Sequence, residues 1–200
     1  MKTRINISIQ YLTVSLMIAS ILFSAGCKSN QEKSNESVSS SKELEKVVKA
    51  PEMDLHTAVF LENMEAINQH ILAESDLNIA EPSVGSSPLI SAAAFGKTKA
   101  AKALIEGGAN VNFQNNDGST ALHSSAFLCR TDIVKLLLSN GADKEIKNNV
   151  GSTALATVAG KFSDVKAIYD IFSKELGPLG LKFDYEQIQK TRPQIAALLN

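Results

Sequence analysis

GSSPL at residues 85–89, GSTAL at residues 118–122 and GSTAL at residues 151–155 are copies of one pattern, each starting 33 residues after the one before. A fixed period of this length is typical of a solenoid, in which similar units stack on their neighbours. Within one unit the apolar spacing is helical, because Leu122 and Ala126 lie one turn apart and an apolar-rich run at 133–138 follows a short break. Each unit closes with Gly-Ala and a polar residue, at 108–110 and 141–143, where glycine can adopt a positive φ. The sequence predicts an all-α fold with two helices per unit.

The unit at residues 115–147 resembles the ankyrin repeat almost position for position. The matching motifs are TALH at 120–123, SA at 125–126, DIVKLLL at 132–138 and GAD at 141–143, and the preceding unit keeps them at 87–89, 92–93 and 108–112. The resemblance implies an ankyrin-repeat solenoid of helix-turn-helix units joined by β-hairpin-like loops. We expect about four repeats, at residues 51–81, 82–114, 115–147 and 148–176, of which the last lacks one residue between its helices.

The tail at residues 177–200 is expected to be a C-terminal cap or a partial fifth repeat. Asp184 is placed to cap a short helix with Tyr185 and Ile188, and Thr191 with Gln194 resembles a capping box that opens a second helix at 193–199. Ile195, Leu198 and Leu199 would then cover the last repeat.

Residues 1–26 have the order of a secretory signal peptide: Lys2 and Arg4, an apolar run over 11–23, and then small residues before Cys27. The stretch at 23–27 resembles the lipobox of bacterial lipoproteins, which implies that Cys27 is lipidated and becomes the mature N-terminus. Ser24 departs from that pattern, because the family usually has an aliphatic residue there. Ordinary cleavage after Gly26 is the alternative, and an uncleaved anchor is disfavoured because polar residues interrupt the apolar run.

A polar segment follows the cysteine. Residues 28–42 consist of Ser, Asn, Gln, Glu and Lys with Val38 as the only aliphatic residue, so they bury too little to offset the entropy of folding. We therefore interpret residues 27–50 as a lipidated cysteine with a disordered tether, which places the protein in the bacterial cell envelope, lipid-anchored and facing the periplasm or the exterior.

Composition excludes several classes of function. The chain has 20 Lys and Arg against 21 Asp and Glu, which gives no basic footprint for nucleic acid, and its two cysteines, Cys27 and Cys129, cannot form a disulfide framework. None of His56, His70 and His123 stands at metal-ligand spacing from a cysteine or carboxylate. We expect no metal, no cofactor and no catalytic residue, a structural hydrogen-bonding role for His123, and an inert thiol at Cys129.

The resemblance implies that loop tips and the exposed side of each first helix line one concave partner-binding surface. Phe95, Phe127 and Leu128 are the sharpest anchor candidates, because exposed apolar groups mark interfaces, although they could instead cap neighbouring helices. The full set of expected contact residues is Phe60, Leu61, Ser83, Val84, Ser86, Ala94, Phe95, Asn116, Asp117, Ser119, Phe127, Leu128, Asn149, Val150 and Ser152.

Charge is unevenly distributed along the repeats. No Lys or Arg occurs between Lys49 and Lys97, whereas seven acidic residues do, so the first repeat could steer a basic partner or be a solvated face. These features together predict a monomeric, membrane-tethered interaction protein that binds another protein in the envelope. An immunity or inhibitor protein that neutralises a toxin or enzyme is the alternative, and an enzyme with groups assembled across repeats is a remote one.

Overall fold

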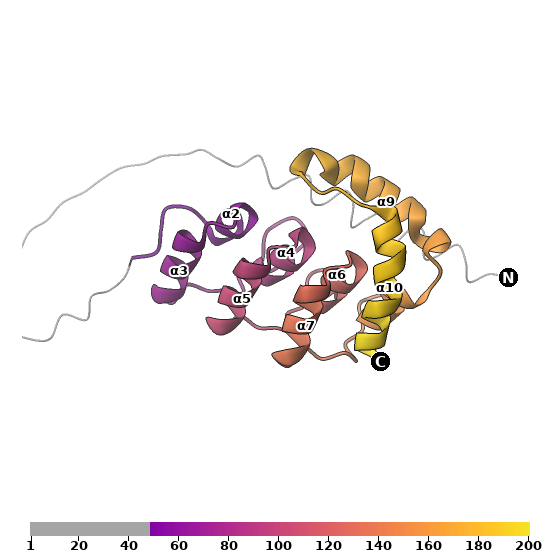
Figure 1. Ribbon diagram of the computed structural model, residues 1–200. Helices are drawn as coiled ribbons and strands as arrows, with labels where there is room; N and C mark the ends of the chain where they lie inside the picture. The colour runs from indigo at the N-terminus through magenta and orange to yellow at the C-terminus, as the bar shows by residue number, and fades with distance from the viewer. Residues whose placement is uncertain (1–48) are drawn as a thin grey trace, which may run out of the picture.

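The computed structural model describes residues 49–200, which form nine α-helices and one 3-10 turn (Figure 1). The predicted signal peptide, Cys27 and most of the predicted tether lie outside the described residues. The first three units are helix pairs: α2 (Leu55–Leu61) with α3 (Met64–Leu72), α4 (Pro88–Phe95) with α5 (Thr98–Glu106), and α6 (Ala121–Phe127) with α7 (Thr131–Ser139). The helical spacing read from the sequence is confirmed in these units.

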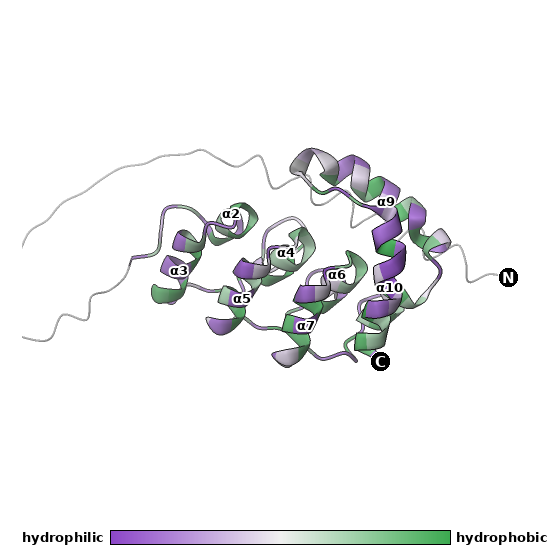
Figure 2. Cartoon of the chain, in the orientation of Figure 1, coloured by the Kyte–Doolittle hydropathy of each residue, from purple (hydrophilic) through white to green (hydrophobic). Residues whose placement is uncertain are grey.

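The helices form two stacked rows. The inner row consists of α2, α4, α6 and α8 (Ala154–Ala159), and the outer row of α3, α5, α7 and α10 (Tyr185–Leu199), with each helix packed on the next in its row. In Figure 2 the inner helices α4 and α6 are mostly hydrophobic, whereas α5 and α7 mix polar and apolar residues. One continuous core runs between the rows, with Ile67, Leu104 and Leu137 fully buried in it.

Each inner helix begins at a residue that satisfies free backbone amides. The side chains of Asp54, Ser87 and Thr153 accept a hydrogen bond from the amide three residues on. At α6 the cap is reciprocal, because Thr120 pairs with His123 through the ring nitrogen Nδ1, and His123 Nε2 lies 2.9 Å from the carbonyl oxygen of Ser152 in the next unit. The structural role expected for His123 is confirmed, and it joins two repeats.

The fourth unit differs from the expectation. The turn after each of the first three inner helices contains a residue with positive φ, namely Glu62, Gly96 and Cys129, which sends the outer helix back along the inner one. The shorter turn after α8 has no such residue, because Gly160 and Lys161 are both extended. The helix that follows, α9 (Phe162–Leu176), therefore leaves the outer row and passes over the inner side of the array (Figure 1).

The helix α10 takes the outer place that α9 vacates. The 3-10 turn η2 (Gly177–Leu179) leads back to α10, which packs on α8 and α7 and buries Ile195 and Leu199 against the core. The expected second helix start at residue 193 is wrong, because α10 is continuous through Pro193. The hydroxyl of Thr191 instead accepts a hydrogen bond from Gln187 Nε2 at 3.1 Å, so it does not cap a new helix.

Candidate partner-binding surface

Three pairs of residues occupy equivalent positions at the ends of the inner helices, where ankyrin repeats are expected to contact a partner. The pairs are Phe60 and Leu61 at the end of α2, Ala94 and Phe95 at the end of α4, and Phe127 and Leu128 at the end of α6. Each pair is followed by the turn residue with positive φ. The sequence makes these positions alike, but the structure gives the three pairs different surroundings.

The pair in the third repeat is buried beneath α9. Phe127 is 7% exposed and stacks on Tyr169 with ring centroids 4.8 Å apart, and Phe172 meets it edge-on at 5.7 Å. Leu128 is 9% exposed in the same cluster. An internal helix thus covers these two predicted partner contacts, and the arrangement is the one of the alternative, in which they pack against neighbouring helices.

Tyr169 connects α9 to the rest of the fold. Its hydroxyl donates to the carbonyl oxygen of Phe127, and Arg192 of α10 donates to the Tyr169 oxygen through Nη1 at 3.3 Å. Burial raises the pKa of the Tyr169 phenol, so it stays protonated and remains a donor. Burial likewise raises the pKa of the nearby Cys129 thiol, which agrees with the expected inert thiol.

In the first repeat, one residue of the pair remains open. Leu61 is 58% exposed, although it stands at the same repeat position as the buried Leu128. Phe60 lies edge-on to Phe95 with centroids 5.0 Å apart, and Lys97 Nζ is 5.9 Å from the Phe60 ring centroid. Along the inner face, α9 thus covers the pair of the third repeat, and the pair of the second repeat is partly buried. In the first repeat Leu61 is accessible.

The loop tips hold neighbouring repeats together. The amide of Asn116 donates to Val84 O at 3.0 Å, and the amide of Asn149 donates to Asp117 O at 2.9 Å. Asn116 also lies against Gly85, where a Cβ atom would come within 2.3 Å of its Oδ1. These two asparagines, predicted as partner contacts, are exposed but also carry inter-repeat hydrogen bonds.

The remaining predicted loop residues vary in exposure. Ser86 is buried, and Ser83 donates through both amide and hydroxyl to Glu81. Burial raises the pKa of the Glu81 carboxyl, but hydrogen bonds from Ser83, Val84 and Ser86 lower it to a net value below the ordinary one. Ser119, Ser152 and Asp117 are partly buried and Val150 is 43% exposed, so Val150 is the accessible apolar residue of this set.

An open groove of about 460 Å³ lies beside the buried third-repeat pair. Its lining comes from the turns after α4 and α6 and from the segment at residues 182–191. Arg130 extends across Gly96 in this groove, since a Cβ atom at Gly96 would lie 3.2 Å from Arg130 Nε. The groove was not foreseen from the sequence, because only the return of the chain through α9 and η2 creates it.

Among residues 49–200, no group of three or more His, Cys, Asp or Glu side chains is arranged to hold a metal ion. In the same residues no helix combines the length and hydrophobicity needed to span a membrane. His56, like His123, bonds to a backbone carbonyl, with Nε2 2.9 Å from Ile79 O.

Comparison with known proteins agrees with this geometry. Residues 55–148 match the family model for ankyrin repeats, in three copies. The chain is similar to the crystal structure of the ankyrin repeat domain of Bcl-3, described as a unique member of the IkappaB protein family, with 31% identity and a TM-score of 0.51. The match covers 59% of this chain and 50% of the Bcl-3 chain, so it spans about half of that domain. No curated protein matches.

Ankyrin repeats are protein-interaction units, and the match to them coincides with the three regular helix pairs. The divergent α8, α9 and α10 lie beyond the matched residues. The described fold is the ankyrin-repeat fold, and residues 55–148 of this chain carry three ankyrin repeats.

Proposed function

We propose that the chain is a membrane-tethered interaction protein of the bacterial envelope, and that its partner binds the inner face where the first repeat leaves it open. One observation carries the choice of surface: Leu61 is 58% exposed, whereas Leu128 at the equivalent position is 9% exposed beneath α9. Leu61 is singled out by its position and not by exposure alone, because it occupies the repeat position that the amphipathic helix α9 covers in the third repeat.

Capture of the partner tests the surface. The mature protein, purified from its native envelope after crosslinking, should retain one stoichiometric partner. Leu61→Arg should abolish retention, while Leu72→Arg should not, because Leu72 is 68% exposed at the opposite end of the same helix pair. Equal retention by both variants and the parent would refute the surface. A toxin or enzyme recovered in this way, and inactive while bound, would support the alternative that the protein is an inhibitor.

The tether requires a separate experiment, because it depends on the lipobox-like stretch at residues 23–27. Cells fed an alkyne-tagged fatty acid should label the protein, and Cys27→Ser should remove both the label and membrane retention. Cys129→Ser is the matched control and should leave the label intact. A mature N-terminus at Cys27 without label would instead establish ordinary signal-peptidase cleavage.

A further inference from the structure

The first repeat is rich in acidic residues. Seven acidic residues and no Lys or Arg occur between Lys49 and Lys97. The two ion pairs formed within residues 49–200 lie elsewhere, at Lys102 with Glu106 and Lys166 with Asp170. Some of the seven carboxylates have structural roles, since Asp54 caps α2 and Glu81 accepts loop amides. Of the other five, Glu62 and Glu65 are the ones in the turn and the first helical turn that follow Leu61.

Glu62 adopts a conformation that its side chain disfavours. Its φ is +53°, in the left-handed region, where the equivalent position of the second repeat has Gly96 at +70°. Glycine would satisfy this turn without strain. Cys129 holds the same turn of the third repeat at φ +55°, so the left-handed turn belongs to the fold and only its residue differs. In the first repeat that residue is Glu62, which places a carboxylate next to the exposed Leu61.

The shape of the face is indicated by its internal occupant. The amphipathic helix α9 lies over the third repeat with Val165, Ile168, Tyr169 and Phe172 buried against it, while its polar residues face outward. Residues at this helical spacing form one apolar stripe. Phe127 and Leu128 form the face on which α9 packs, and Phe60 and Leu61 occupy the same positions in the first repeat. A helix with a similar amphipathic pattern therefore fits the first-repeat end of the array.

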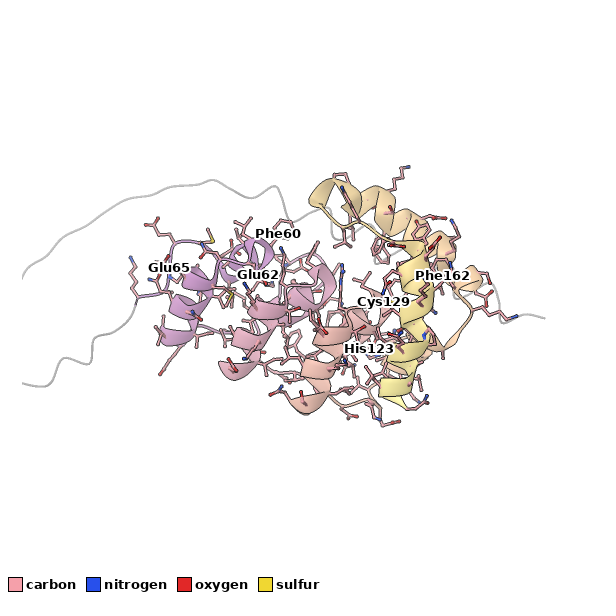
Figure 3. The ribbon with its side chains drawn as sticks, in the orientation of Figure 1. Phe60, Glu62, Glu65, His123, Cys129 and Phe162 are labelled. Atoms are coloured by element: carbon pink, nitrogen blue, oxygen red, sulfur yellow. The ribbon has the colours of Figure 1, made fainter. Side chains whose placement is uncertain are left out.

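We propose that the partner presents a basic amphipathic helix, which lays its apolar stripe on Leu61 and its Lys or Arg residues beside Glu62 and Glu65. Figure 3 shows Phe60, Glu62 and Glu65 on the first repeat, far along the array from Phe162 at the start of α9. The adjoining cation Lys97 is directed to the Phe60 ring and offsets part of this charge. The proposal rests on the proposed function and specifies the chemistry of the partner.

Two labelled 15-residue peptides serve as probes. Both peptides keep the apolar residues of the segment 162–176. At the remaining positions, one peptide alternates alanine and lysine, and the other alternates alanine and glutamate. Measured by fluorescence anisotropy on the full mature protein, the lysine peptide should bind about tenfold tighter than the glutamate peptide and should weaken as salt is raised.

Charge reversal locates the binding site. The double variant Glu62→Lys and Glu65→Lys should weaken the lysine peptide about tenfold. The control double variant Glu145→Lys and Glu186→Lys changes the net charge equally at exposed positions elsewhere and should leave affinity within about twofold. Circular dichroism of each variant checks that the repeats remain folded. Equal effects of the two double variants, or equal binding of the two peptides, would overturn the proposal.

The outcome also separates this inference from the proposed function. If the native partner requires Leu61 but tolerates reversal of Glu62 and Glu65, the surface stands and the basic helix is wrong. If the native partner tolerates Leu61→Arg, the surface itself is wrong. Loss of the native partner on reversal at 62 and 65, with retention in the control, supports both.

Discussion

Leu61 and Leu128 provide a matched test of how α9 changes the repeat surface. They are the same residue at the same position of two repeats, but Leu61 is 58% exposed and Leu128 is 9% exposed. Truncation of a buried leucine to alanine costs about 2 to 5 kcal/mol, whereas surface substitutions usually change stability by about 0.5 kcal/mol or less. Because Leu128 lies at the edge of its cluster, we expect about 2.5 kcal/mol for Leu128→Ala.

Urea unfolding of the two variants measures the difference. With an m-value of about 2 kcal/mol per molar urea, Leu128→Ala should lower the midpoint by about 1.25 M, and Leu61→Ala should shift it by about 0.25 M or less. The m-value should stay unchanged in both, since we expect the array to unfold as one unit. Equal midpoint shifts would refute the position of α9 over the third repeat, and so would loss of partner binding without loss of stability in Leu128→Ala.

Three further predictions concern the repeats themselves. Leu137→Ala, at a fully buried core position, should destabilise by about 2 to 5 kcal/mol in the same urea assay, and a separate melting transition for one repeat would contradict the single core. Glu62→Gly should stabilise the fold by about 1 kcal/mol, because glycine adopts the positive φ of this turn without strain, and Gly96→Ala should destabilise it for the same reason. A lower thermal midpoint for Glu62→Gly, or a higher one for Gly96→Ala, would count against strain at these turns. Burial lowers the pKa of His123, so the unfolded chain binds the proton more tightly; stability from this residue is complete above pH 6.5 and decreases as pH falls below it. The variant His123→Gln should flatten that part of a stability-against-pH curve, and a slope identical to the parent's would exclude His123 as its source.

The sequence by itself determined the repeated part of this fold, because the signals that specify it are local. The 33-residue interval, the residues that begin the inner helices and the turn glycines act within one unit or between adjacent units. The role of His123 was predictable for the same reason, since its hydrogen bonds join Thr120 in its own cap to Ser152 in the next unit.

Tertiary structure alone decided which equivalent positions remain exposed. The missing residue after α8 is visible in the sequence, but its consequence is a change in chain direction that places α9 across the inner face and α10 in the outer row. Phe127 and Leu128 stand at repeat positions that predict exposed partner contacts, but the fold buries them. Leu61 stands at the same repeat position as Leu128 and is exposed. Burial depends on what packs from a distant part of the chain, and no local pattern carries that information.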